Sequence, residues 1–371
     1  MAMGGAFVGQ ADNPSAVWYN PAGITDLDGT RISAGGIAIY PVLTHENANG
    51  TTDVSERSVF LPAQLFVTDK LNDRVSLGLG ITSPFGLSTD WSDTSATSSV
   101  ATLSRVKSIN INPDIAYKIS DTLSVAIGLD YMIIQATLDK LLFPGGPNFR
   151  LGGNGEGLGA NAGIKYKATD QLNLGLSYRS RIKVKVDGTA EVSALGLSNS
   201  ARTDITLPDL MQVGASYKAS DKLTINADLE YTWWSTYDRL VVQSNTLIPL
   251  IGTNTSTEEK DWENTWIIRI GGQYKLSDQW KLRAGYVYDQ NPVPSNRFET
   301  RVPDSDRQGV SIGTGYMSGN ITVDVSYLYL RFKNRTITDS LADDATSTPN
   351  ALNGTYKSQA HLAGITIGYK F

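Results

Sequence analysis

Residues 172–187 read LNLGLSYRSRIKVKVD, and apolar and polar side chains alternate along the stretch. A period of two is typical of a β-strand with one apolar and one polar face. The apolar face would carry Leu172, Leu174, Leu176, Tyr178, Ile182, Val184 and Val186, and the other face Arg179, Arg181, Lys183 and Lys185. Strands of soluble proteins usually have only about 3–10 residues. The stretch therefore predicts a strand of a transmembrane β-barrel, whose apolar face meets lipid while its charged face lines the lumen.

The same alternation recurs along the chain and predicts an all-β fold. We expect fourteen strands, at 30–44, 57–69, 74–84, 100–118, 123–141, 157–168, 171–188, 203–218, 222–241, 261–275, 279–290, 306–317, 320–333 and 356–371. A Tyr-Lys-x-Ser/Thr-Asp motif recurs at Tyr117, Tyr166, Tyr217 and Tyr274, and its Ser/Thr-Asp pair favours a short turn. Short turns alternating with longer loops predict a 14-stranded antiparallel barrel with both ends on the periplasmic side.

Composition excludes several classes of protein. The 371 residues contain no cysteine and two histidines, carry a net charge of −5, and have a mean hydropathy of −0.19. No run approaches the roughly 18 apolar residues that a membrane-spanning helix needs. The acidic balance argues against nucleic acid as a partner. Without cysteine there is no thiolate metal site or thiol nucleophile, and no metal or cofactor is expected.

The first 29 residues differ from the rest of the chain. They are small, polar and glycine-rich, and residues 18–25 read WYNPAGIT. Proline lacks an N–H group and glycine tolerates unusual backbone angles, so this stretch is not a spanning strand. Fourteen strands enclose a lumen too wide for side chains to fill. We therefore expect residues 1–29 to form an N-terminal hatch and residues 30–371 the barrel. The hatch residues of interest are Trp18, Asn20, Pro21, Ala22 and Gly23. We expect Asn20–Gly23 to face a kink in the third strand.

The chain resembles the FadL family of outer-membrane transporters for long-chain fatty acids and other hydrophobic compounds. The stretches that carry the resemblance are MGGAFVGQADNPSAVWYNPAGIT at the N-terminus, GLGITSPFGLSTDW at 78–91, ITLPDLMQVGASY at 205–217, YTWWSTYDRL at 231–240 and GYVYDQNPVPSNRFETRVPDSDRQGVSIGTGY at 285–316. The resemblance implies a hatch inside a fourteen-stranded barrel in a bacterial outer membrane. It also implies uptake of an apolar ligand, which leaves sideways through an opening made by a kink in the third strand.

The resemblance assigns roles to particular residues. The kink maps to Ser83, Pro84, Phe85 and Gly86, and a proline and a glycine within an alternating strand independently indicate a bulge or bend. The alternative is that Pro84 only ends the strand. Two basic residues, Lys140 and Lys260, would hold the ligand's polar head. Both could instead be solvated lysines, and Lys260 could pair with Glu258 or Glu259.

The third outer loop, residues 142–156, reads LFPGGPNFRLGGNGE and is expected to be short and irregular. Fatty-acid transporters of the family often carry a longer helical insertion here, so this departure favours a smaller hydrocarbon, whereas a head-group lysine favours a fatty acid. Long-chain fatty acid is the first expectation and monoaromatic hydrocarbon the second.

Arg297, Asp304, Asp306 and Arg307 lie close together in sequence and are interpreted as a structural ion network. Lumen residues such as Arg179, Arg181 and Asp228 are expected to support the hatch. An enzyme is not expected, because neither His45 nor His361 has a nucleophile motif beside it. A diffusion porin is disfavoured by the hatch.

The expected partners are a hydrophobic small molecule, outer-membrane lipid and lipopolysaccharide. The last strand alternates and ends in Phe371, a usual mark of outer-membrane barrels that the barrel assembly machinery reads. The protein is expected to be a monomer.

Overall fold

The computed structural model describes residues 1–47, 50–246, 253–341 and 351–371. The strand segments are β1 Thr30–Asn47, β2 Thr52–Val54, β3 Ala63–Lys70, β4 Val75–Thr82, β5 Leu87–Asp90, β6 Leu103–Lys118, β7 Leu123–Leu141, β8 Asn148–Lys167, β9 Leu172–Arg179, β10 Ile182–Val192, β11 Leu197–Leu207, β12 Leu210–Lys218, β13 Leu223–Thr232, β14 Arg239–Ser244, β15 Thr255–Glu259, β16 Thr265–Lys275, β17 Trp280–Asp289, β18 Arg307–Ser318, β19 Ile321–Phe332, β20 Arg335–Ile337 and β21 Gly354–Lys370. Helical turns are α1 Ala16–Tyr19 and the 3₁₀ turns η1 Pro21–Asp26, η2 Ser193–Leu195, η3 Trp234–Thr236 and η4 Ser295–Arg297.

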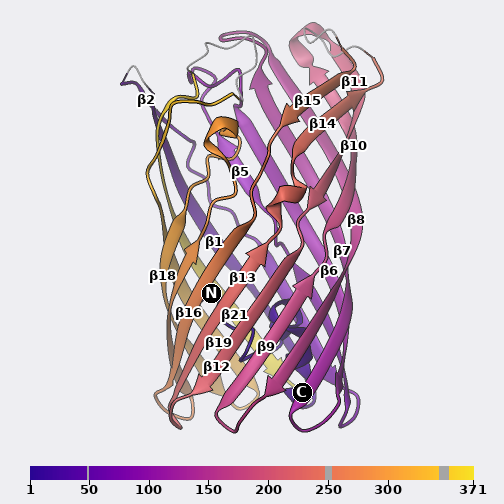
Figure 1. The fold of residues 1–371 in the computed structure, drawn as a ribbon, viewed down its shortest axis with the longest axis vertical. Helices are drawn as coiled ribbons and strands as arrows, with labels where there is room; N and C mark the ends of the chain where they lie inside the picture. The colour runs from indigo at the N-terminus through magenta and orange to yellow at the C-terminus, as the bar shows by residue number, and fades with distance from the viewer. Residues whose placement is uncertain (48–49, 247–252, 342–350) are drawn as a thin grey trace.

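These segments build a closed antiparallel barrel. Seven strands of the wall are each interrupted once, namely β2/β3, β4/β5, β9/β10, β11/β12, β13/β14, β15/β16 and β19/β20, so the described segments make up fourteen strands. The ladder from Arg31↔Lys370 to Asn47↔Gly354 joins β1 to β21 and closes the ring. The prediction of a 14-stranded barrel is confirmed, and short turns lie at one end with the C-terminus while longer connections lie at the other (Figure 1).

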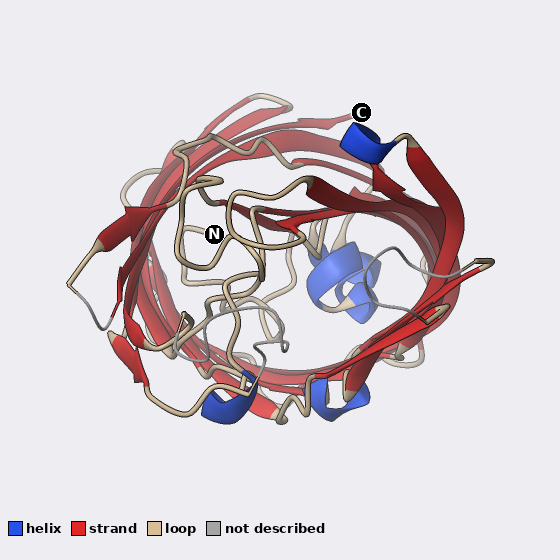
Figure 2. Cartoon of the chain, turned by 90° about the horizontal axis from the view of Figure 1, so that it is seen from above, coloured by secondary structure: helices blue, strands red, loops and turns tan. Residues whose placement is uncertain are grey.

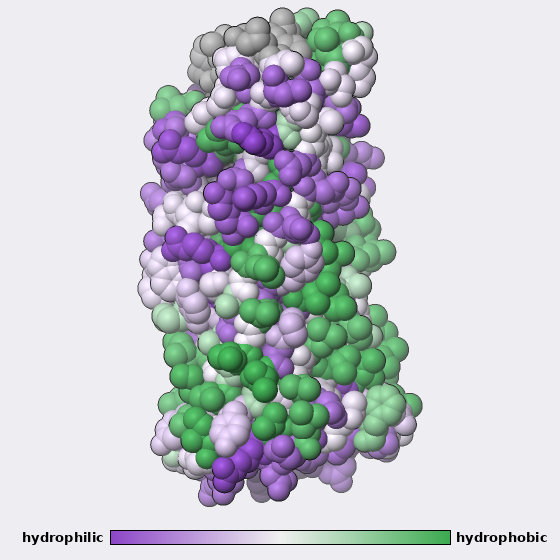
Figure 3. Space-filling view, turned by 90° about the vertical axis from the view of Figure 1, so that its right-hand side faces the viewer, coloured by the Kyte–Doolittle hydropathy of each residue, from purple (hydrophilic) through white to green (hydrophobic). Residues whose placement is uncertain are grey.

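The lower wall has the polarity predicted for a membrane barrel. Aromatic residues near the short turns are exposed, namely Tyr117, Tyr166, Tyr217, Tyr274, Trp280 and Tyr369. A second exposed aromatic row includes Tyr178, Trp266, Tyr286 and Tyr327. Tyr274 and Trp266 lie on one face of β16, and at ~3.3 Å per residue and a ~40° tilt their separation corresponds to a band about 20 Å tall. Exposed Leu, Ile and Val side chains fill this band, which is the green lower half of the barrel in Figure 3.

The upper wall has the opposite polarity, because one strand line reverses its faces. In β9, Arg179 is buried and Tyr178 is exposed, whereas in β10 Val184 and Val186 are buried and Lys183 is exposed. The prediction that residues 172–187 form one strand with a single apolar outer face is therefore wrong beyond Arg179. The reversal occurs at Ser180-Arg181, beside a matching break at Pro208-Asp209 between β11 and β12. Above the break, apolar side chains point inward and charged ones outward, as the purple upper half of Figure 3 illustrates.

Asp209 holds this break in place. Its carboxylate accepts hydrogen bonds from the Arg181 backbone N–H at 3.0 Å, from Arg181 Nε at 2.7 Å and from the Tyr178 hydroxyl at 2.6 Å. The Arg181 side chain consequently lies on the outer surface, 60% exposed. The expectation that Arg181 lines the lumen and supports the N-terminal segment is wrong for this reason.

The expected third outer loop is also corrected. Strand β8 begins at Asn148, so only residues 142–147 connect it to β7, and most of the predicted loop is strand. Gly153, Gly155, Gly157 and Gly159 occupy the inward positions of β8, and a Cβ on Gly155 or Gly157 would meet β10 backbone or side-chain atoms within 3.0 Å. Glycine is generally rare in strands, but here the missing side chains make room for Ile182, Val184 and Val186.

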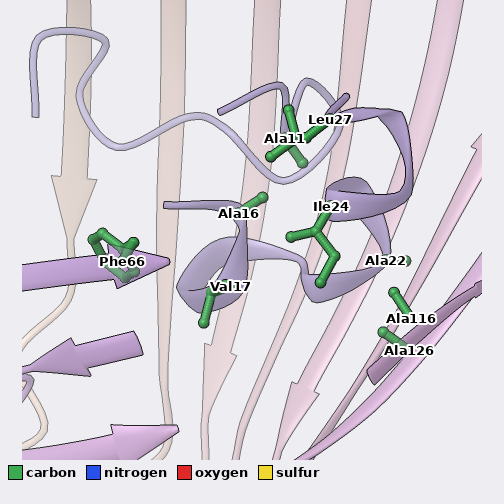
Figure 4. Packing of buried hydrophobic residues seen from close by; sticks show 9 residues of the cluster. All are labelled: Ala11, Ala16, Val17, Ala22, Ile24, Leu27, Phe66, Ala116 and Ala126. Carbon is green, nitrogen blue, oxygen red and sulfur yellow. The ribbon is translucent and has the colours of Figure 1, made fainter. Parts of the chain in front are cut away.

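Within the described residues, no helix has the length and apolar character that crossing a membrane would require. The helical turns of residues 16–26 lie inside the ring of strands, together with the N-terminus (Figure 2). Their apolar side chains form a small core with the wall, made of Ala11, Ala16, Val17, Ala22, Ile24, Leu27, Phe66, Ala116 and Ala126 (Figure 4).

Candidate functional site: an apolar chamber above the N-terminal segment

The N-terminal segment, residues 1–29, packs tightly into the lower lumen. Asp228 accepts the backbone N–H of Phe7 at 2.5 Å and of Val8 at 2.9 Å. Fully buried Asn20 donates to the carbonyl of Val8 at 3.1 Å and to that of Ile164 in β8 at 2.9 Å. Because these are directional bonds between buried groups, they fix the segment to the wall.

Asn20 also shapes the chain around the Asn-Pro-Ala-Gly turn. It ends α1 in an extended conformation, and its side-chain oxygen accepts the Ala22 N–H at 3.2 Å, which starts η1 at Pro21. A side chain on Gly163 of β8 would collide with Asn20 and Pro21. This turn therefore faces β8 and β9, and the expectation that it faces the third-strand kink is wrong. Val17 lies nearer to that strand, against Gly78 and Gly80 of β4.

Arg179 connects the N-terminal segment to the wall electrostatically. Its buried guanidinium pairs with Asp130, donates to the carbonyls of Val17 at 2.9 Å and Trp18 at 3.0 Å, and lies 4.1 Å from the centre of the Trp18 ring. A buried charge is tolerated only when it is paired and hydrogen-bonded. Arg179 meets both conditions. It supports the N-terminal segment from the wall, as expected for a lumen residue.

Above Arg179 and Asp130, inward apolar side chains pack into a cluster in the upper lumen, which we call the chamber. Its walls are the inward side chains of the reversed strands and their neighbours, namely Met132, Ile134, Ile182, Val184, Val186 and Leu207, with Phe85, Val106 and Ile205 against them. A hollow of about 60 Å³ extends upward between Ala136, Leu151, Val186, Ile205 and Leu240. A drug-sized ligand fills roughly 300–1,000 Å³, so the side chains around the hollow must part to admit one.

The third strand of the wall is interrupted where the sequence placed the kink. Strand β4 ends at Thr82 and β5 begins at Leu87, so Ser83–Gly86 leave the ladder. The ladder with β3 runs no further than Leu65↔Ile81. The Ser108 hydroxyl accepts a hydrogen bond from the Phe85 N–H at 2.9 Å and donates one to the Phe85 carbonyl at 2.5 Å.

The interruption turns Phe85 toward the chamber. Its ring packs on the chamber cluster and lies edge-on to Trp234, with 6.4 Å between ring centres. In the described part of the chain, the next backbone hydrogen bond between the second and third strands is Glu56 N–H to the Asp90 carbonyl. The chamber and the gap in the wall therefore adjoin one another.

Charged side chains gather at the top of the chamber. Buried Lys260 donates to Glu258 at 2.9 Å and to Glu299, and Arg301 lies 3.6 Å from Glu299. Lys140, Glu258 and Arg301 line a second, smaller hollow of about 20 Å³, which shares Leu151 and Leu240 with the first. Burial disfavours the ammonium of Lys260, but Glu299 and Glu258 outweigh it, so the pKa of Lys260 is raised. The structure thus brings Lys140 and Lys260 to one cluster, with Lys260 already paired.

The four residues interpreted as an ion network do not form one cluster. Arg307 pairs with Asp304 at 3.2 Å and with Asp289 at 2.5 Å. Asp306 accepts the Asn291 N–H at 3.1 Å, and Arg297 pairs instead with Asp261 at 2.7 Å. Among the described residues, no three His, Asp or Glu side chains gather in a way that could hold a metal ion.

The fold and interior together define an outer-membrane β-barrel whose lumen is filled below and apolar above. The family model described as outer membrane protein transport protein (OMPP1/FadL/TodX) matches residues 1–371, and the chain belongs to this family. The long-chain fatty acid transport protein of Salmonella typhi is 27% identical over 377 residues, covering 88% of this chain and 85% of that protein. Outer membrane protein P1 of Haemophilus influenzae is 26% identical and covers all of this chain and 93% of its own length.

Solved structures share the fold over the whole chain. A Pseudomonas aeruginosa FadL homologue superposes with a TM-score of 0.86 at 21% identity, covering 100% of this chain and 97% of its own. The Ralstonia pickettii toluene transporter TbuX superposes with a TM-score of 0.78 at 18% identity and the same coverage. The resemblance noted from sequence is confirmed. The family comprises outer-membrane transport proteins for hydrophobic compounds, with fatty-acid and toluene transporters among them.

Proposed function

We propose that this protein takes up long-chain fatty acids across the outer membrane by passive transfer, without catalysing a reaction. The observation that carries the proposal is the reversal of wall polarity, which lines the upper lumen with Ile182, Val184 and Val186. Burying an alkyl chain there gains about 0.8 kcal/mol per methylene group. The chain contains no phosphate-binding GxxxxGK[ST] motif, so the gradient of the ligand itself drives the transfer.

The ligand's path follows from the chamber's neighbours. The carboxylate is received at the top by the cluster that contains Lys140, Lys260 and Arg301, because charge-assisted hydrogen bonds there stabilise an anion. The alkyl chain enters the hollow as its side chains part. The N-terminal segment acts as a plug that blocks the direct route to the periplasm. The ligand leaves sideways past Phe85, through the gap at Ser83–Gly86.

Two observations support this assignment of substrate. Relatives at 25–27% identity are named long-chain fatty acid transport proteins, and Lys140 and Arg301 line the smaller hollow that adjoins the apolar one. Monoaromatic hydrocarbon remains the second candidate, because Lys260 is already paired with two carboxylates and an uncharged ligand would need no head-group site.

Binding of three ligands to the purified protein tests the proposal. A radiolabelled long-chain fatty acid, the fatty alcohol of the same length and toluene are compared by equilibrium dialysis. We expect the acid to bind most tightly and the alcohol to follow. Tighter binding of toluene would favour the second candidate, and the absence of binding by all three ligands would refute the proposal.

A further inference from the structure

A groove lies on the outer wall, away from the chamber. It encloses about 440 Å³ and is lined by Tyr288, Gln308, Arg331, Lys333, Asn334 and Asp306. Tyr288 pairs with Gln308, and Gln308 pairs with Arg331, so three side chains stand in one row across β17, β18 and β19. We call this surface the outer groove.

The outer groove lies where the apolar band ends. Directly below its row, Val310 and Ile312 are exposed by 58% and 64% and face outward among Tyr286 and Tyr327. Trp280, at the lower edge of the wall, stands on the same face of β17 as Tyr288. Their separation along β17 corresponds to about 20 Å of height at ~3.3 Å per residue and ~40° tilt. The groove is therefore level with the head groups of the outer leaflet.

The outer groove carries positive charge that the described residues do not neutralise. Arg331 and Lys333 are exposed, and no carboxylate of the described chain lies within ion-pair distance of either. Arg307, at the inner end, is already paired with Asp289 and Asp304. Asp306 is the one carboxylate among the lining residues, and it is held by the Asn291 N–H. Arg331 and Lys333 thus give the groove two positive charges, against the one negative charge of Asp306.

We propose that the outer groove binds the phosphate of an anionic lipid of the outer leaflet. The Arg331 guanidinium matches two phosphate oxygens with parallel N–H donors, and Lys333 supplies a second cation. The amides of Gln308 and Asn334 offer further donors. The acyl chains then lie along Val310 and Ile312. Because these apolar residues adjoin the cations, the occupant is a lipid phosphate and not free phosphate.

Native mass spectrometry of the whole protein tests the assignment. Wild type and the double variant Arg331→Gln/Lys333→Gln are extracted in mild detergent and offered equal amounts of phosphatidic acid and phosphatidylcholine. Each surface cation is worth about 1 kcal/mol toward an anionic head group, so the double variant should lose roughly 30-fold of the preference for phosphatidic acid. Lys183→Gln/Lys185→Gln removes two outward cations of the upper wall and should retain the preference. Heat-dependent migration of the barrel on gels verifies folding.

Three results would overturn the assignment. Equal retention of phosphatidic acid by wild type and the Arg331/Lys333 variant would remove the groove as the site. An equal loss of the preference for phosphatidic acid in the Lys183/Lys185 control would show that the effect comes from the net charge of the protein and not from the groove. Competition by millimolar inorganic phosphate as effective as that by phosphatidic acid would identify a free-anion site.

Discussion

Replacing Arg179 with methionine tests how the N-terminal segment is held. The substitution keeps most of the side-chain volume but removes the partner of Asp130 and the donors to the carbonyls of Val17 and Trp18. Asp130 and Arg179 both lie in the wall, so the two carbonyl bonds are the part of this network that reaches the segment. A hydrogen bond from a charged donor contributes about 1.5–3 kcal/mol. Asp130 keeps hydrogen bonds from Asn110 at 2.7 Å and Asn161 at 3.3 Å, so we take the lower end of that range, about 3 kcal/mol for the two bonds. About 3 kcal/mol corresponds to a roughly 150-fold rise in the undocked population of the segment.

Hydrogen exchange followed by mass spectrometry measures this population directly. Amides of residues 1–29 should exchange roughly 100-fold faster in Arg179→Met than in wild type, because exchange follows local opening. Amides of the barrel strands should be unchanged. In planar bilayers the same variant should show larger ion currents.

Arg181→Met is the matched control, because this arginine lies two residues away on the opposite face. Its side chain is 60% exposed and pairs with Asp209 on the outer surface, where such pairs contribute about 0–1 kcal/mol. Equal exchange of residues 1–29 in the two variants would refute the anchoring role of Arg179. The double variant Arg179→Met/Asp130→Asn should recover part of the protection, because it leaves no unpaired buried charge.

Two further predictions concern the head-group cluster and the kink. Glu258→Gln removes a carboxylate beside Lys260, so the affinity for a fatty acid should rise roughly ten-fold while the affinity for the matching alcohol stays constant. Glu259→Gln, on the outward face, is the control. If Glu258→Gln leaves the ratio of the two affinities unchanged, the head group binds elsewhere. Ser108→Ala removes both hydrogen bonds to Phe85 and should weaken the kink by about 1–2 kcal/mol, seen as faster exchange at 83–86. Ser104→Ala is its control, since that buried hydroxyl has no hydrogen-bond partner among the described residues. Equal exchange in both variants would contradict the role of Ser108.

Alternation predicted the lower barrel well, because there each strand separates lipid from a polar lumen. It could not predict the upper barrel, where the two faces exchange roles. The two faces swap at breaks at Ser180-Arg181 and Pro208-Asp209. Apolar and polar residues alternate both before and after each break, so the alternation alone does not show which face points inward. Pro208 was the one local sign of a break. The hydrogen bonds of Asp209 to Arg181, 28 residues earlier, cannot be read from local sequence.

The candidate site was predicted only in part, because local sequence does not show contacts between distant residues. The interruption at Pro84 follows from local chemistry, since proline cannot donate to a ladder, and the structure places it beside the chamber. The glycines of β8 were misread as loop, because their role depends on Ile182 and Val184 of another strand. Lys260 was singled out, but its partner Glu299 lies 39 residues further along the chain and was missed. Arg301 was missed as well.

We propose that hydrophobic ligands pass through the upper chamber. The most direct test of this claim is fatty-acid uptake by cells that lack their own outer-membrane transporter and carry either Ala136→Trp or Gln135→Trp. Ala136 lines the hollow, whereas its neighbour Gln135 is exposed on the outer face of β7. Ala136→Trp should reduce uptake to the level of cells without the protein, and Gln135→Trp should support wild-type uptake. Equal uptake by the two variants, at equal levels of folded protein, would contradict the claim.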